Sequence, residues 1–185
     1  VNDIVITEKH TVRIDNVLLE EIDAPPVVEA PTGENLLTNG DFASEDADWE
    51  AYIDSTAAQA SVSYVDNKAA FTIENAGTED YHVQLKHSEM VLENGSSYTV
   101  KFTIQSSEAR TVKYALLDAP AGYKWYGGED LTLEAGVPYQ VEKEITVSEL
   151  PTSDSVQFMV SMGKIAEEDT PASLIEISDV SIVKK

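Results

Sequence analysis

Residues 98–105, YTVKFTIQ, alternate apolar and polar side chains without interruption. Tyr98, Val100, Phe102 and Ile104 fall on one side of an extended chain, because successive side chains of a β-strand point to opposite faces. Such a strand buries one face in a core and leaves the other face in water. The stretch therefore predicts one strand of a sheet that is covered on one side.

The same period of two recurs at residues 112–116, 139–145 and 156–162. Turn-forming sequences such as Glu93-Asn94-Gly95 and Gly127-Gly128 separate the apolar runs. We find no segment with the 3.6-residue period of an amphipathic helix. About ten short strands of this kind predict an all-β fold, a two-sheet β-sandwich or jelly roll.

The composition excludes several classes of partner. Asp and Glu number 34 against 12 Lys and Arg, which gives a formal net charge of −22. This charge repels nucleic acid and anionic lipid, but it is compatible with a neutral glycan or a cation, and solubility alone also explains it. The chain has no cysteine, and it has no apolar run of membrane-spanning length, so we expect no thiolate chemistry and no membrane insertion.

The two ends of the chain contain similar segments. Residues 11–20, TVRIDNVLLE, and residues 174–183, LIEISDVSIV, share the alternation and a central valine, although chance similarity between two strands is an alternative explanation. We interpret residues 1–23 as the terminal strand of a preceding similar module, in a chain that is a processed or excised piece. Residues 24–34 then form a proline-rich linker, and residues 35–185 form the domain itself. We expect residues 11–20 to pair with an exposed sheet edge of this domain or of a neighbouring copy.

Motifs of common enzyme classes are absent from the sequence. The histidines are His10, His82 and His87, and there is no Gly-x-Ser-x-Gly, His-Glu-x-x-His or glycine-rich phosphate loop. Acidic residues are so numerous that pairs of them carry no information about glycoside hydrolysis. We predict a non-catalytic module. A lyase on a β scaffold would instead require a deep pocket of titratable residues that includes His82 or His87.

Aromatic side chains in polar or loop-like sequence are candidates for stacking on sugar rings. These candidates are Trp49, Tyr52, Tyr81, Tyr123, Trp125 and Tyr126. Trp125 is the strongest, because AGYKWYGG is bounded by glycines as in an exposed loop. Trp49 has an alternative role as a plug over one end of a sandwich. By contrast, Tyr98, Tyr114 and Tyr139 alternate with apolar residues, so we expect them to be buried.

The segment 81–87 predicts a strand with Val83 and Leu85 toward the core. His82, Gln84 and Lys86 then point to the opposite face. The amide of Gln84 has two donors and an acceptor, which suit a pair of sugar hydroxyls, although an ordinary exposed glutamine is the alternative.

Four segments in order resemble the carbohydrate-binding modules of families 4, 9, 16 and 22. They are NLLTNGDFASEDADWEAYI (35–53), DYHVQL (80–85), VLENGSSYTVKFTIQS (91–106) and EISDVSIVK (176–184). The resemblance covers residues 35–185 and implies a jelly roll attached to a glucanase, xylanase or mannanase. Residues 11–21, TVRIDNVLLEE, are similar to the closing strand of such a module, which favours a tandem arrangement.

The resemblance also implies a site for a single glycan chain, in a cleft on the concave sheet. An aromatic residue and a polar residue three positions later correspond to Tyr81 and Gln84. The second aromatic residue corresponds to one of Tyr123, Trp125 and Tyr126, and a further polar residue to Gln157 or Ser161.

The implied function is non-catalytic polysaccharide binding that targets a covalently linked glycoside hydrolase to its substrate. The NGDF opening followed by tryptophan, together with the aromatic-x-Val-Gln-Leu form, resembles modules of β-1,3- and mixed-linkage glucanases, and this resemblance favours β-glucan over xylan or mannan. Such a protein is secreted, or it is attached to the cell surface. The alternative is a structural or adhesive spacer of a cell-surface protein without a working glycan site, in which Tyr81 and Trp125 would be buried or disordered.

Many members of these families hold one structural Ca²⁺. The resemblance assigns its ligands to Asp41, the carbonyl of Lys68 and Asp179, which are oxygen donors of the kind calcium prefers. The sequence departs from the family pattern at two positions. Ala43 replaces an acidic residue, and Ser178 stands where the closing aspartate is expected.

Overall fold

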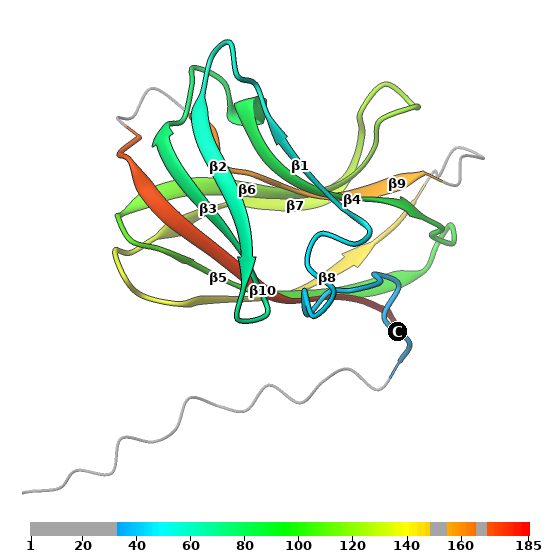
Figure 1. Ribbon diagram of the computed structural model, residues 1–185. Coiled ribbons are helices and arrows are strands. Elements are labelled where there is room, and N and C mark those ends of the chain that lie inside the picture. Colours follow the sequence, from blue (N-terminus) through cyan, green and yellow to red (C-terminus); the bar gives the residue numbers. More distant parts are fainter. Residues whose placement is uncertain (1–32, 149–154, 166–169) are drawn as a thin grey trace, which may run out of the picture. The chain divides into compact units, whose positions relative to one another are not determined.

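The computed structural model describes residues 33–148, 155–165 and 170–185, and these residues form two five-stranded sheets that are stacked face to face (Figure 1). The predicted strand at 11–20 lies outside the described residues, so its pairing stays a prediction. In the described ranges, no helix is long and apolar enough to cross a membrane.

We name each sheet after one of its strands. The β4 sheet has the strand order β1 (Trp49–Ile53), β4 (Val83–Met90), β9 (Val156–Ser161), β6 (Arg110–Asp118) and β7 (Lys124–Leu133). The β5 sheet has the order β2 (Gln59–Val65), β3 (Lys68–Asn75), β10 (Ser173–Lys184), β5 (Ser97–Ser106) and β8 (Tyr139–Thr146). All strand pairs are antiparallel, and a short 3₁₀ turn, η1 (Asp80–His82), precedes β4. Along the sequence, the chain passes several times from one sheet to the other. The predicted jelly-roll sandwich is confirmed.

The core lies between the sheets and is built by the alternating residues of the sequence. In β5 every second side chain, from Tyr98 to Ile104, is buried. The ring of Phe102 contacts Tyr114 of β6 and Phe158 of β9 edge to face, with centroids 5.2 and 5.6 Å apart. Aromatic pairs of this geometry contribute about 0.5–1.5 kcal/mol each beyond the area they bury. These contacts join the two sheets.

Two of the three tyrosines expected in the core are buried there. Tyr98 and Tyr114 are buried, but the expectation for Tyr139 is wrong, because 41% of its surface is exposed. Tyr139 opens β8, the last strand of the β5 sheet, where it pairs with Ile104. Its side chain is on the face of β8 that points toward the core. Because β8 is an edge strand, a neighbouring strand of the sheet covers this side chain on one side only.

A buried arginine connects the two sheets at one end of the sandwich. From the start of β6, Arg110 donates through Nη1 to Ser173 Oγ of β10 at 2.8 Å, and through Nη2 to the carbonyl of Met162 just after β9. Burial lowers the pKa of Arg110 to about 10. The guanidinium group therefore fixes the backbone that leaves β9.

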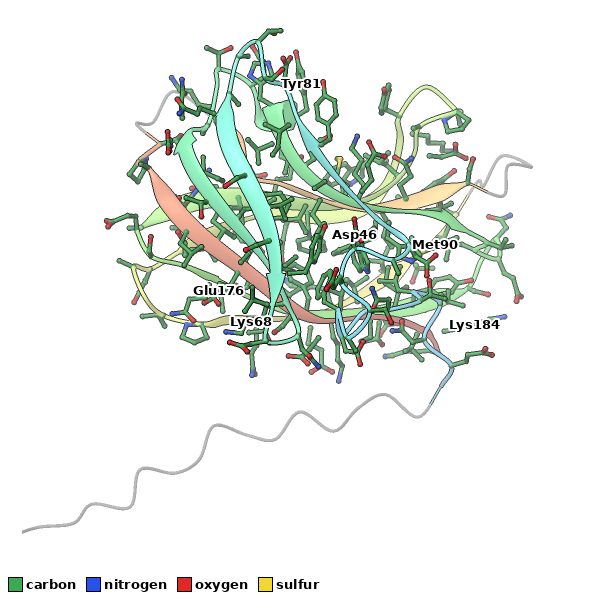
Figure 2. The ribbon with its side chains drawn as sticks, in the orientation of Figure 1. Asp46, Lys68, Tyr81, Met90, Glu176 and Lys184 are labelled. Atoms are coloured by element: carbon green, nitrogen blue, oxygen red, sulfur yellow. The ribbon has the colours of Figure 1, made fainter. Side chains whose placement is uncertain are left out.

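We predict that Arg110→Met lowers the free energy of unfolding by about 2–4 kcal/mol, because buried acceptors lose their donors. Urea denaturation measures this change. Lys184→Met is a suitable control, since Lys184 forms an exposed ion pair with Glu93. Lys184 is labelled in Figure 2. The control should cost less than about 1 kcal/mol, and equal losses for the two variants would contradict the role assigned to Arg110.

Candidate functional site

The outer face of the β4 sheet presents two rows of side chains that run across all five strands. The register aligns Tyr52, Gln84, Ser161, Lys113 and Asp130 in one line, which we call the Gln84 row. Because strand side chains alternate, each of these residues points away from the other sheet.

The second row lies two residues away from the first row on each strand. It consists of Glu50, Lys86, Met159, Ala115 and Gly128, and we call it the Lys86 row. Beyond it, Gln157 is opposite Leu117, and Leu117 is opposite Trp125. The predicted polar residues Gln157 and Ser161 therefore share the face that carries Gln84.

Four of the five exposed aromatic side chains of the described residues lie at this sheet, and the fifth, Tyr139, is on the β5 sheet. Tyr52 and Tyr81 are 37% and 49% exposed at one side of the face, and Tyr123 and Trp125 are 74% and 49% exposed at the other. The outer face of the β5 sheet differs, since β5 contributes residues such as Thr99, Lys101 and Thr103 there. Large exposed rings against a polar strand surface mark the β4 sheet as the candidate ligand face.

Tyr81, which is labelled in Figure 2, is held by a turn that is hydrogen-bonded on two sides. The backbone N–H of Gly163 donates to the carbonyl of Asp80 at 3.1 Å, and the N–H of Asp54 donates to the carbonyl of His82 at 2.9 Å. A Cβ at Gly163 would lie 2.1 Å from the carbonyl oxygen of Glu79, so only glycine permits this approach. The exposed ring therefore stands on a fixed base.

The placement of His82 corrects a prediction. It is buried and does not point outward beside Gln84, because η1 interrupts the strand period and β4 begins only at Val83. Its Nδ1 accepts the backbone N–H groups of Thr78 and Glu79 at 3.1 and 3.3 Å. Its ring meets Tyr81 edge to face, with centroids 4.9 Å apart. His82 thus supports Tyr81 from beneath.

Charged groups around the turn are paired. The Lys113 ammonium lies 2.8 Å from Asp80 Oδ2 and 3.8 Å from Asp130 Oδ1. Burial alone would lower the pKa of Lys113, but the hydrogen bond and charge of Asp80, together with Asp130, raise it overall. Nearby, hydrogen bonds from the hydroxyl and backbone of Thr56 lower the pKa of Asp54. The ammonium of Lys113 is therefore held between two carboxylates.

Gln84 and Ser161 lie on the predicted face, but they form its floor. Both are buried, and Gln84 Nε2 donates to Ser161 Oγ at 3.0 Å and contacts Met159 Sδ at 2.8 Å. The amide therefore already has partners within the protein. Its role is to fix the floor between the exposed rings.

Trp125 lies on the outer face because of a β-bulge in β7. The register shifts between Leu116 and Leu117, so that Leu116 pairs with Gly127 and Leu117 pairs with Trp125. Gly128 has a φ of +145°, and a Cβ there would lie 3.0 Å from Cη2 of Trp125. The indole therefore rests against the sheet where a side chain is missing. Leu117 beside it is buried, although it faces outward.

The same bulge corrects the prediction for Tyr126. Tyr126 falls between the two pairs and turns inward, where it packs against the core. Tyr123 has a φ of +60° in the loop before β7 and is exposed, as expected for a candidate. Of the three aromatic residues in this stretch, Tyr123 and Trp125 reach the surface.

Trp49 is part of the core and is absent from this face. Its indole is buried on the inner side of β1, and Nε1 donates to the carbonyl of Asn39 at 2.9 Å. Its ring meets His87 and Phe158 edge to face at 5.1 and 6.2 Å. The alternative role as a plug is therefore the one that the structure supports. Tyr52, two residues later, takes the outward position.

Two of the predicted calcium ligands, Asp41 and Asp179, lie in segments that meet through the backbone. The N–H of Val180 donates to the carbonyl of Gly40, so the backbone brings the closing strand close to Asp41. However, Asp41 caps the N–H of Ala43. Asp179 accepts from Ser178, and the ammonium of Lys68 pairs with Glu176. Among the described residues, no three His, Cys, Asp or Glu side chains are placed to hold a metal ion. The predicted set consists of two carboxylates and the backbone carbonyl of Lys68, so calcium binding stays a prediction.

Comparison with known proteins places this geometry in a family. The model of a carbohydrate-binding domain of the family 4 and 9 type matches residues 34–173. A cellulose 1,4-β-cellobiosidase of Acetivibrio thermocellus is 31% identical over 120 residues. That match covers 63% of this chain and 13% of the cellobiosidase, so the chain spans a small part of the relative.

Solved structures share the fold. A CBM4 structure has a TM-score of 0.66 at 21% identity, over 80% of this chain and 99% of the other. The second N-terminal cellulose-binding domain of Cellulomonas fimi β-1,4-glucanase C has a TM-score of 0.64 at 18% identity, over 84% and 97% of the two chains. The first N-terminal domain of that glucanase has a TM-score of 0.61 at 20% identity, with the same coverage. The structural likeness supports the jelly roll, and because the family model matches well over half of the sequence, the chain belongs to the family of carbohydrate-binding domains of the family 4 and 9 type.

Proposed function

We propose that the outer face of the β4 sheet binds a single polysaccharide chain, a β-glucan in preference to xylan or mannan. The observation that carries this proposal is the pair of half-exposed rings, Tyr81 before β4 and Trp125 in β7, on opposite sides of one face. A spacer without a glycan site is expected to have these rings buried or disordered. Their exposure favours binding.

The geometry suits one extended chain. β4 and β7 are separated by β9 and β6, so roughly 14 Å of sheet lies between the two aromatic sides. Sugar rings carry apolar C–H faces that stack on Tyr81, Tyr52 or Trp125, while their hydroxyls meet polar groups in between. Lys113 and Gln157 are partly exposed there and supply such groups.

The charge on this face is compatible with a neutral ligand. Lys86 is 3.8 Å from Glu50 and lies over the ring of Tyr52 at 4.5 Å, and Lys113 is paired with Asp80. Each cation is thus offset by a nearby acid. The relatives named as a cellobiosidase and as cellulose-binding domains of a β-1,4-glucanase support the choice of a β-glucan.

The module performs no chemistry in this proposal. It tethers a covalently linked glycoside hydrolase to polysaccharide outside the cell, in a secreted protein or at the cell surface. Tethering raises the local concentration of substrate at the linked enzyme without any new catalytic contact.

Calorimetry against soluble β-glucans, xylan and mannan tests the proposed function. We expect measurable binding to a β-1,4- or mixed-linkage glucan and weaker binding to xylan and mannan. No binding to any of these polymers by the folded chain would contradict a glycan-binding function. Tighter binding to xylan or mannan would contradict the preference.

Trp125→Ala tests the position of the site. We expect the affinity for the preferred glycan to fall by about 2 kcal/mol, or roughly thirtyfold, as is typical of a central aromatic contact. Tyr139→Ala is the matched control, because Tyr139 is similarly exposed but lies on the β5 sheet. Equal effects of the two substitutions would place the site elsewhere.

Calcium remains a prediction of the family resemblance, and thermal unfolding tests it. Millimolar CaCl₂ should raise the melting temperature above that in EDTA by several degrees if the ion is structural, because a bound ion stabilises the folded state. Asp179→Asn should abolish the difference. Identical melting curves in CaCl₂ and EDTA would remove calcium from the description of this module.

A further inference from the structure

A separate cavity opens at the edge of the β4 sheet, beside β1. It has a volume of about 450 Å³, and its lining combines two apolar residues with five polar or charged ones: Leu36, Trp49, Thr38, Asp48, Glu50, Lys86 and His87. Neither Tyr81 nor Trp125 contributes to it. However, Glu50 and Lys86 also belong to the Lys86 row of the outer face. The cavity therefore adjoins the proposed glycan face at the end of that row.

The polar groups of this cavity are already organised. Thr38 Oγ1 donates to Asp48 Oδ2 at 2.8 Å and lies 3.2 Å from His87 Nε2. The segment before β1 is fixed by Asn39, whose Nδ2 donates to the carbonyls of Glu45 and Ala47 at 2.9 Å each. A ligand would meet donors and acceptors that are already in place, which reduces the entropy cost of binding.

The composition of the lining selects a class of ligand. A metal cation would not find three His, Cys, Asp or Glu side chains grouped to hold it among the described residues. An anion would meet the carboxylates of Asp48 and Glu50, and an apolar molecule would leave the charges of the lining without solvent. A neutral, hydroxyl-rich molecule satisfies both kinds of group, because each hydroxyl can donate to a carboxylate and accept from an ammonium. A sugar unit has this chemistry.

The Lys86 row connects the cavity to the exposed tryptophan. It runs from Gly128, against which the indole of Trp125 rests, through Ala115 and Met159 to Lys86 and Glu50 at the edge. A glycan chain stacked on Trp125 and crossing the strands along this row would reach the cavity. We propose that the cavity beside β1 is a terminal subsite, which takes a sugar unit of the chain bound on the face. This inference rests on the proposed function.

Asp48→Asn in the full chain tests the subsite, with cellohexaose and the corresponding laminari-oligosaccharide as probes in calorimetry. We expect the affinity for the probe that binds the wild type to fall about fivefold or more, because a charged hydrogen-bond acceptor is lost. Asp46→Asn is the matched control, since it makes the same charge change in the same loop away from the lining, and it should leave the affinity unchanged. Glu50→Gln is the second test variant, and melting temperatures show that each variant is folded.

The imidazole signal of His87 in NMR gives an independent measure of occupancy, since the chain has only three histidines. We expect this signal to shift when the oligosaccharide is added. Binding with an unmoved His87 signal, or with unchanged affinity for Asp48→Asn and Glu50→Gln, would overturn the subsite and leave the proposed function standing. A wild-type chain that binds no glycan would overturn both.

Discussion

The contact of Phe102 with Tyr114 and Phe158 is the interaction on which the rest of the domain depends. It fixes which side of β5, β6 and β9 faces the core. Because the period of a strand is two residues, a slip of one residue would reverse every side chain of that strand. Burial of these rings therefore also decides which residues reach the outer face. The residues of the Gln84 row and of the Lys86 row are those that alternate with the core residues along the strands.

The alternation of apolar and polar residues in the sequence was sufficient to predict strands and their buried faces. The alternation from Tyr98 to Ile104 predicts both a strand and its buried side, and the structure has both. The glycine-bounded stretch around Trp125 predicts an exposed ring, which the structure also shows. Both predictions rest on local chemistry, in which neighbours along the chain determine the outcome.

The predictions that fail depend on contacts between distant segments. Trp49 and Tyr52 both lie in polar sequence, and only the packing of Trp49 against His87 and Phe158 sends one ring inward. The bulge that separates Trp125 from Tyr126 arises from pairing with β6. Tyr139 is exposed because of its place at a sheet edge, and strand order cannot be obtained from alternation. The cavity beside β1 joins residues from three segments, and a short motif would not reveal it.

Gly128 has a consequence for how close to the sheet a stacked ring can lie. With a hydrogen atom as its side chain, the indole of Trp125 lies low against the backbone of β6 and β7. The residue at this position thus acts as a spacer that sets the height of the aromatic surface above the strands. A low aromatic surface keeps a ring that stacks on it close to the polar groups of the neighbouring strands, whereas a raised one would hold that ring away from them. A Cβ at position 128 would also lie 2.1 Å from the carbonyl oxygen of Tyr114, so a larger residue there would disturb the pairing of β6 with β7 together with the position of the indole.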